Sequence, residues 1–304
     1  MAPEPQLQWK FEAIGTHFWI GVYQSLDAAV WQNLQATVAI VVEEFDAIWS
    51  RFRADSLVAR MSQQAGEYNL SAEGRELLQL YRALYDATDG AVTPLVGDAL
   101  SDLGYDAQYS LQPKSLIRPV LPWDDVMRLD GNKLTMLQPA LLDFGAAGKG
   151  YLVDRIGRLL EKAGVSAYCV DGSGDLRVRD LEPGLQIGIE HPEDLQAVIG
   201  VVRINDAALC VSAPNRRRWG QANKLHHIIN PQATAPTQGI RTVAVQAHDA
   251  AVADGLATAL FMVPPKSLQT AFDFDYLVLY DDYSVAHSPG FPAQLFIKQE
   301  MPDA

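Results

Sequence analysis

Hydrophobic residues recur with the period of an α-helix in several parts of the chain. Residues 29–52 predict a long, largely buried helix. Residues 71–90 predict a second helix, with Ser71 as its N-cap and Gly90 at its end. Its apolar face consists of Leu77, Leu78, Tyr81, Leu84 and Tyr85. The first part of the chain is therefore expected to be mainly helical.

A third amphipathic helix follows the small-residue segment at 145–150. Its apolar stripe consists of Leu152, Ile156, Leu159, Leu160 and Ala163. The opposite, polar side is expected to carry Asp154, Arg155, Arg158, Glu161 and Lys162. Gly164 is predicted to end the helix, because glycine readily adopts the left-handed conformation found after many helices.

The second half of the chain is rich in predicted strands. They fall at residues 166–170, 176–180, 185–191, 197–204, 207–212, 241–248 and 275–282. A further helix is predicted at 249–263, and residues 105–140 are expected to be irregular with short strands. Helices followed by a strand-rich half do not alternate regularly, so the fold class is predicted as α+β with mixed, largely antiparallel sheets and flanking helices.

Composition limits the possible functions. The 304 residues are expected to form one unit, 1–304, or two closely packed lobes. A net charge of −13 argues against sequence-independent nucleic-acid binding, which needs a basic face. An acidic protein would repel a phosphorylated ligand, and a bound divalent cation would offset that repulsion.

The cysteines and the N-terminus carry no export or metal signal. Cys169 and Cys210 are far apart and are predicted to be small core residues in strands. The first 15 residues lack the basic start and apolar core of a signal peptide, and no stretch reaches 18 apolar residues. We therefore expect no membrane span and a cytoplasmic location, although an exported protein with its leader removed would look the same.

The segment "LDFGAAGKGYLVDR", residues 141–154, places a lysine within a run of small residues at a helix start. It is not a Walker loop, because Lys149 is followed by glycine and Gly145 is too close. Close backbone approach, free N–H groups and a cation would still suit a phosphate. The alternative is a tight strand-to-helix turn with an exposed lysine.

Two further patterns could carry chemistry. Asp254 and Thr258 are four residues apart on a predicted helix, so they share a face and offer the oxygen ligands that Mg²⁺ prefers. Such a pair also arises by chance on many helices. His226 and His227 are adjacent in an expected strand, so only one of them can face a given site and exchange protons there. The alternative is a histidine bonded to backbone at a strand end.

Two polar segments have both a structural and a functional interpretation. The turn "DGSGD" at 171–175 could bind phosphate or ribose, or could simply connect two strands. Arg51 and Arg53 could anchor an acidic group, although intramolecular salt bridges explain them as well. Motifs of hydrolase triads, zinc peptidases and Rossmann dehydrogenases are absent from the sequence.

In this order, the motifs resemble those of the ApbE family, the FAD:protein FMN transferases. The resemblance extends from about residue 11 to about residue 263. It rests on Gly15-Thr16, "WSRFRADS" (49–56), "TDGAVTPLVG" (88–97), "LDFGAAGKGYLVDR" (141–154), "VDGSGDLRV" (170–178), "IGIEHP" (187–192), "HHIINP" (226–231) and "AVADGLATALF" (251–261). Eight motifs in the family's order are much more specific than any one of them.

The resemblance implies a T-fold-like enzyme that uses Mg²⁺ to cleave FAD and transfers FMN to a Thr or Ser hydroxyl of a target flavoprotein, releasing AMP. It implies Asp254, Thr258 and the backbone carbonyl of Gly148 as metal ligands, and His227 as the catalytic base. The residues it implies for FAD binding are Asp143, Lys149, Asp171, Gly172, Ser173, Gly174, Asp175 and Ser212.

The chain departs from the family pattern near two of these residues. The family's A-T-S-G-x-Y is replaced by "VSAPN" (211–215), where Ala213 replaces glycine and Pro214 removes an N–H group. Asn230 replaces the aspartate of H-I-I-D-P. Two alternatives therefore stay open: an FAD pyrophosphatase that yields FMN and AMP, and a non-catalytic FAD-binding protein.

Overall fold

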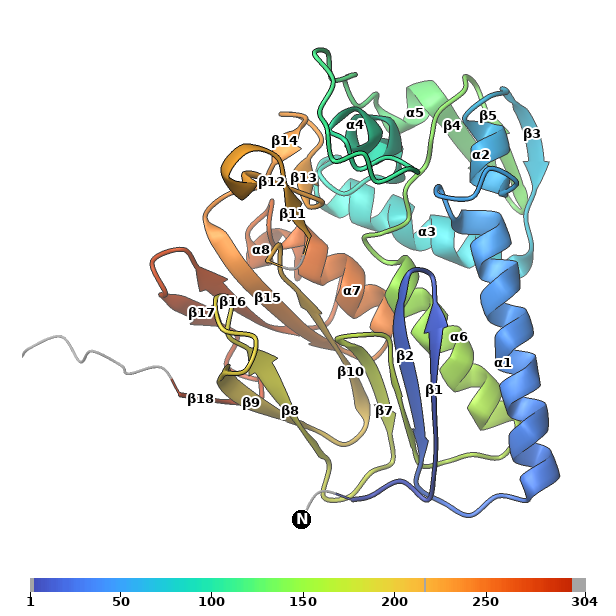
Figure 1. Cartoon of the computed structure of the whole chain (residues 1–304), viewed down its shortest axis with the longest axis vertical. Coiled ribbons are helices and arrows are strands. Elements are labelled where there is room, and N and C mark those ends of the chain that lie inside the picture. The colour runs from blue at the N-terminus through green and yellow to red at the C-terminus, as the bar shows by residue number, and fades with distance from the viewer. Residues whose placement is uncertain (1–2, 216, 297–304) are drawn as a thin grey trace, which may run out of the picture.

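An eight-stranded antiparallel sheet forms the centre of the protein (Figure 1). The structure is a computed structural model and describes residues 3–215 and 217–296. The strands, in spatial order, are β1 (Leu7–Ala13), β2 (Thr16–Val22), β6 (Tyr168–Asp171), β7 (Asp175–Arg179), β10 (Ala207–Ser212), β15 (Ile240–Ala247), β16 (Asp275–Tyr280) and β17 (Val285–His287). The expected α+β class is confirmed.

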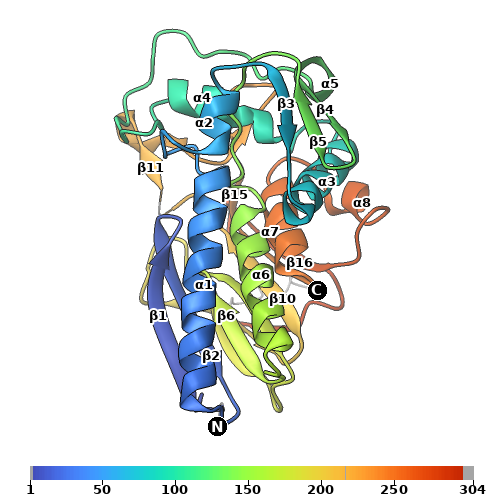
Figure 2. The same cartoon turned by 90° about the vertical axis from the view of Figure 1, so that its right-hand side faces the viewer.

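Helices cover one face of this sheet, and a smaller sheet covers the other. Figure 2 shows α1 (Ala28–Trp49) and α6 (Gly148–Lys162) in front of the central strands. Helix α7 (Ala250–Ala259) lies beside α6 and packs on β10 and β15. The smaller sheet has the order β18 (Ala293–Leu295), β9 (Val198–Ile204) and β8 (Leu185–Glu190).

Both faces of the central sheet are buried at β6 and β10, and these two strands are largely apolar. In β10, Ala208 and Cys210 pack in the core under the helices, whereas Leu209 packs against the smaller sheet. In β6, Cys169 faces the smaller sheet. Successive side chains of a strand point to opposite faces, which explains this division. The prediction that both cysteines are core residues in strands is confirmed.

The remaining elements gather at one end of the sheet, at the top of Figure 1. Helix α3 (Ala72–Ala87) packs against α7 there. The short elements are α2 (Leu57–Met61), β3 (Gly66–Asn69), α4 (Gly97–Asp102), α5 (Trp123–Val126), β4 (Met127–Asp130), β5 (Lys133–Met136), β11 (Arg218–Trp219), β12 (Leu225–His226), β13 (Ile229–Asn230), β14 (Ala235–Pro236) and α8 (Pro265–Leu268). A third, small apolar cluster joins α4 to β11 and β13.

The predicted helices and strands are found close to their expected limits. Ser71 caps α3, because its hydroxyl accepts a hydrogen bond from the N–H of Gly74. Gly90 and Gly164 follow their helices with φ of 81° and 82°, in the left-handed region. Segment 105–140 contains only short elements, as expected.

The N-terminal hairpin of β1 and β2 was not predicted. Its strands alternate between more and less exposed positions, and β2 pairs with β6 through Trp19 opposite Asp171. The turn between them consists of Ile14 and Gly15, with φ of 46° and 74°. Two-residue hairpins of this type favour Asn-Gly, and a β-branched residue is unusual at positive φ. The turn therefore has no recognisable sequence signal.

The position of Asp154 differs from the expectation. The sequence placed this carboxylate on the solvent-facing side of α6, but only 1% of the residue is exposed. The reason is that α7 packs beside α6 and covers this position. Arg158 and Glu161, farther along α6, stay more accessible.

Helices α6 and α7 touch through their backbones at Gly150. A Cβ atom at this position would lie 2.2 Å from the carbonyl oxygen of Ala250 and 2.8 Å from Cβ of Asp254. Neither atom can move without moving α7. Glycine at 150 is therefore needed for the approach of the two helices, and not for a turn.

We expect Gly150→Ala to destabilise the fold by about 2 kcal/mol, because the added methyl group forces α6 and α7 apart. Urea unfolding followed by circular dichroism measures this free energy. Gly148→Ala is the matched control: its Cβ would meet Phe144 Cβ at 3.4 Å, which is ordinary contact. That control should be neutral or slightly stabilising, since alanine favours the helix. Equal effects of the two substitutions would contradict the close contact.

Candidate active site

A cavity of about 530 Å³ lies at the N-terminal end of α6. Its walls come from the β1–β2 turn, the C-terminal end of α1, loop 143–149, the end of β10, segment 227–229 and α7. Among the predicted site residues it is lined by Asp143, Gly148, Lys149, Ser173, Asp175, Ser212, His227, Asp254 and Thr258. Nine of the twelve predicted residues, distant in sequence, thus share one cavity of the size that small-molecule sites usually have.

Four N–H groups before and at the start of α6, which the sequence analysis expected to be free for a phosphate, already have hydrogen-bond partners. The N–H of Gly145 donates to Asp143 Oδ1 at 2.8 Å, and those of Ala146 and Ala147 both donate to the Tyr81 hydroxyl at 3.1 Å. The N–H of Gly148 donates to the Phe144 carbonyl. These four N–H groups are therefore not available to a phosphate, two of them because the buried Tyr81 from α3 accepts their hydrogen bonds.

Lys149 connects α6 to the turn between β6 and β7. Its ammonium donates to the carbonyl oxygen of Gly172 at 2.8 Å and lies 2.7 Å from Asp175 Oδ2. Burial works against its charge, but the carboxylates of Asp175 and Asp254 outweigh burial and raise the pKa of Lys149. The lysine therefore stays positive and holds a fixed position in the cavity wall.

Turn 171–175 shapes this wall from behind. Asp171 Oδ1 accepts the N–H of Gly174, and the Ser173 hydroxyl donates to the carbonyl of His17 in β2. Asp171, Gly172 and Gly174 do not line the cavity within the part of the chain that the structure describes. Their contacts fit the structural interpretation of the turn, and their roles in FAD binding stay predictions.

The pair on α7 shares one face, as its spacing predicts. Asp254 Oδ2 accepts the N–H of Gly150 at 3.0 Å. The Thr258 hydroxyl donates to the carbonyl of Ala146 at 3.4 Å. Gly148, the first residue of α6, lines the cavity. The carbonyl of Ala146 also lies beside the Asp254–Thr258 pair, and the sequence did not indicate it.

The acidic groups at this end of the cavity favour a bound cation. Burial first, and then the charge of Asp175, raise the pKa of Asp254 well above its usual range. Asp175 Oδ2 is buried and, apart from its ion pair with Lys149, has no hydrogen bond among the described residues. A cation would relieve the repulsion between these two carboxylates.

The donor atoms fit magnesium better than zinc. Within residues 3–215 and 217–296, no group of three or more His, Cys, Asp or Glu residues could hold a metal ion. The site offers the Asp254 carboxylate, the Thr258 hydroxyl and backbone carbonyls, while Asp175 is paired with Lys149. Magnesium accepts such sparse oxygen ligation, because water and ligand phosphates complete its coordination.

His226 and His227 have separate environments. His226 is bonded through Nε2 to the carbonyl of Thr237 at 2.9 Å, away from the cavity. His227 lines the cavity, and its buried Nδ1 has no hydrogen-bond partner among the described residues. Burial and the neighbouring charge of Arg217 lower the pKa of His227 to about 3. The imidazole is therefore neutral at pH 7 and can accept a proton.

Aromatic side chains form the other wall of the cavity. They are Phe45, Trp49, Phe52, Tyr105, Tyr109 and Phe144. Phe52 stacks on Tyr109 with ring centroids 5.2 Å apart, and the Arg51 guanidinium lies 4.2 Å from the Phe52 centroid. These rings are brought together by long-range packing, and no local pattern in the sequence indicates them. They suit a planar, aromatic ligand.

Arg51 and Arg53 make intramolecular salt bridges. Arg51 pairs with Asp143 and donates to the carbonyl of Tyr105 at 2.7 Å. Arg53 pairs with Glu43, Asp46 and Asp55. This structural interpretation is confirmed for both arginines. Arg51 Nη2 nevertheless stays buried without a partner among the described residues and belongs to a cavity-lining side chain.

The residues at the two departures from the family pattern have defined positions near the cavity and after β13. Ser212 ends β10 and still lines the cavity, followed by Ala213. Asn230 uses its side-chain oxygen to accept the N–H groups of Gln232 and Ala233. An aspartate would supply the same oxygen, so this substitution keeps the turn after β13.

These features define a class of site: a cavity with an aromatic wall, a fixed lysine and an acidic end suited to Mg²⁺, which together fit an aromatic, phosphorylated ligand. The sequence profile of the ApbE family matches residues 14–275. The chain belongs to the ApbE family.

Curated relatives and solved structures agree with this assignment. The FAD:protein FMN transferase of Escherichia coli K12 is 26% identical, with 93% of this chain and 88% of that protein covered. That of Treponema pallidum is 27% identical, covering 91% and 85%. The ApbE protein of Thermotoga maritima has a TM-score of 0.81 at 20% identity, covering 93% and 97%. The flavin transferase ApbE of Vibrio cholerae has a TM-score of 0.77 at 24% identity, covering 95% and 99%.

The helices of the described residues can be compared with the requirements of a membrane span. In residues 3–215 and 217–296, no helix combines the length and apolar character needed to cross a bilayer.

The lowered pKa of His227 makes stability depend on pH. The unfolded chain protonates this imidazole near pH 6.5 and the native protein only near pH 3, so the free energy of unfolding falls as pH drops below 6.5. In His227→Gln this loss should shrink by on the order of 2 kcal/mol between pH 6.5 and 4.5. Urea unfolding at both pH values measures it. The exposed His248→Gln is the control, and an unchanged loss in His227→Gln would contradict the burial of this imidazole.

Proposed function

We propose that this protein is an FAD:protein FMN transferase. The observation that carries the proposal is the meeting of Asp254, Thr258, Lys149 and His227 in one cavity with an aromatic wall. Membership of the ApbE family and similarity to curated FAD:protein FMN transferases support it. The substrate is FAD, which combines an aromatic ring system with a pyrophosphate.

Asp254 and Thr258 would hold Mg²⁺, with backbone carbonyls at Gly148 or Ala146. Bound there, the ion would neutralise the pyrophosphate and stabilise charge on its oxygens. Lys149 supplies a second, fixed positive charge beside Asp175. Two positive charges at one end of an acidic protein would allow FAD to enter in spite of the net charge of −13.

His227 would serve as the base. Its neutral imidazole accepts the proton of an incoming Thr or Ser hydroxyl of the target flavoprotein. The oxygen of that hydroxyl bonds to the FMN phosphorus. The phosphorus–oxygen bond to AMP breaks, and AMP leaves. A phosphate beside Arg217 would offset the charge that depresses the pKa of His227, so that ligand binding increases its basicity. Proton transfer of this kind contributes roughly 10²–10⁴-fold to rate.

Asp254→Asn should reduce FMN transfer by at least about 100-fold, because it removes the carboxylate proposed to hold the cation. The assay incubates the protein with FAD, Mg²⁺ and a peptide or domain that carries a Thr or Ser flavinylation motif. AMP release and the mass of the acceptor are both followed. Asp273→Asn, an exposed carboxylate outside the cavity, is the control and should retain full activity.

A Mg²⁺-dependent gain by the acceptor of the mass of FMN less one water, lost in Asp254→Asn, would establish the transferase. Free FMN and AMP without acceptor modification would identify an FAD pyrophosphatase instead. Bound, intact FAD in the wild type would identify a binding protein. Full transfer by Asp254→Asn would refute the role of this carboxylate.

A further inference from the structure

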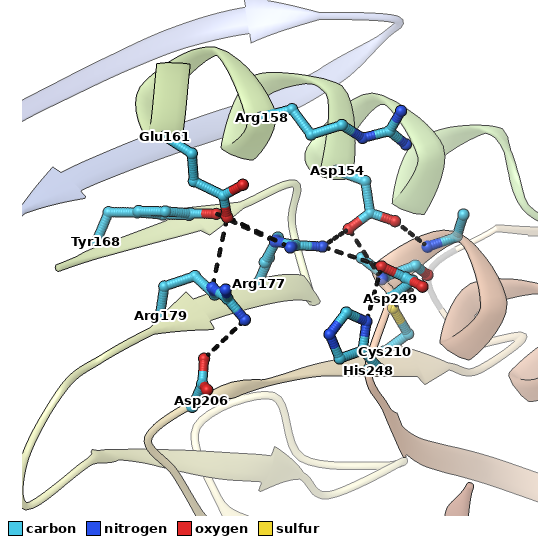
Figure 3. Close-up of polar contacts among 12 residues, drawn as sticks. Asp154, Arg158, Glu161, Tyr168, Arg177, Arg179, Asp206, Cys210, His248 and Asp249 are labelled. Carbon is cyan, nitrogen blue, oxygen red and sulfur yellow. Dashed lines mark hydrogen bonds and ion pairs between the residues drawn. The ribbon is translucent and has the colours of Figure 1, made fainter. Parts of the chain in front are cut away.

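A buried ion pair joins α6, α7 and the central sheet (Figure 3). Asp154 of α6 accepts a 2.7 Å hydrogen bond from Arg177 Nη1, which comes from β7. The exposed fractions of the two side chains are 1% and 6%. Arg177 is held in turn by the Tyr168 hydroxyl at 3.1 Å from its Nε and by Glu161. A charged pair at this depth is costly unless it has many partners, so its contacts bear on its role.

Asp154 caps α7 from a different helix. Its two carboxylate oxygens accept the N–H groups of Ala250 and Ala251, at 3.1 and 2.9 Å. These are the first two N–H groups of α7, which have no partner inside their own helix. Asp249 occupies the N-cap position but makes no capping hydrogen bond, and its carboxylate pairs with Arg177 instead. The start of α7 is therefore fixed by a residue of α6.

The contacts between the two helices repeat at one-turn intervals. Asp154 meets Ala250, Gly150 meets Asp254, and Ala146 meets Thr258. Each step moves four residues back along the α6 segment and four residues forward along α7, as expected for antiparallel neighbours. One helical turn is about 5.4 Å, so a shift of α7 along α6 would remove Asp254 and Thr258 from the loop together.

We propose that Asp154, held by Arg177, is a positioning residue that sets the register of α7 and thereby the affinity of the Asp254–Thr258 pair for a divalent cation. This inference rests on the proposed function, because it takes that pair as the cation site. Asp154 acts through α7 and does not line the cavity. Asp154→Asn keeps the size of the side chain but replaces one of the two acceptor oxygens with an N–H₂ group.

The test measures binding of Mn²⁺ alone to the full-length, FAD-free protein by titration calorimetry. In Asp154→Asn we expect the dissociation constant to rise by about 10- to 100-fold, as for other residues that orient metal ligands. Asp206→Asn is the matched control: its carboxylate also pairs with an arginine of β7, Arg179 at 3.0 Å, but does not touch α7. Its Mn²⁺ affinity should equal that of the wild type.

A second measurement separates positioning from mere loss of folded protein. FMN transfer is followed across Mg²⁺ concentrations: Asp154→Asn should raise the Mg²⁺ midpoint and recover most of kcat at saturating Mg²⁺. Partial unfolding would instead lower kcat equally at all concentrations. If Asp154→Asn has the same Mg²⁺ midpoint and the same Mn²⁺ affinity as the wild type, the proposal is refuted, even if the variant has a lower melting temperature.

If Asp154→Asn does not fold, Arg177→Lys is judged by the same criteria. It keeps Asp154 and a positive charge but loses the bonds to Tyr168 and Glu161 that hold the pair in place. If the wild-type protein binds Mn²⁺ but does not transfer FMN, the proposed function is contradicted. The calorimetric comparison of the variants still tests the positioning role of Asp154. Absence of Mn²⁺ binding in the wild type would refute both the cation site and this inference.

Discussion

The backbone contact between α6 and α7 at Gly150 is the constraint on which the site depends. It brings the N–H of residue 150 within 3.0 Å of Asp254 and leaves no room for a methyl group. At Gly255 a Cβ would lie 2.5 Å from Cδ1 of Leu84 of α3, a side-chain end that can shift more easily than the backbone that Gly150 meets. Helices α6 and α7 are thus in backbone contact beside the loop before α6, and α3 packs on α7 through side-chain contacts at Leu84. The oxygen atoms proposed to hold a cation come from this packing, and not from a flexible loop.

Paired charges organise the interior around this contact. Asp175 and Arg177 point to the same side of β7, two residues apart, and meet Lys149 and Asp154 of α6. Each element therefore contributes one positive and one negative group to the other. The arrangement neutralises all four charges in two pairs, and Asp254 adds a further carboxylate close to Asp175. The local excess of negative charge at the cavity end is what a divalent cation would balance.

The sequence predicts well what local patterns encode. Local patterns predict the amphipathic helix α6, the Ser71 cap of α3 and the shared face of Asp254 and Thr258, and the structure contains all three. The motif order identified the family and, with it, nine residues that line one cavity.

Features that depend on distant packing were missed. The Ile14–Gly15 turn lacks the usual hairpin residues, so β1 and β2 were not expected. Asp154 follows the polar period of α6 yet is buried, because α7 covers it. Tyr81, from another helix, accepts hydrogen bonds from the N–H groups of Ala146 and Ala147. The aromatic wall and Arg217 likewise become neighbours of the site only through the fold.

The placement of the two cysteines has a consequence for the chemistry that the fold can tolerate. Cys169 and Cys210 lie on opposite faces of the central sheet, so they cannot form a disulfide with each other. Burial raises the pKa of both thiols, and Cys210 is further occupied by donating to the carbonyl of Ala250. Thiols of this kind react slowly with oxidants and alkylating agents. The folded protein should therefore be equally stable in reducing and oxidising surroundings.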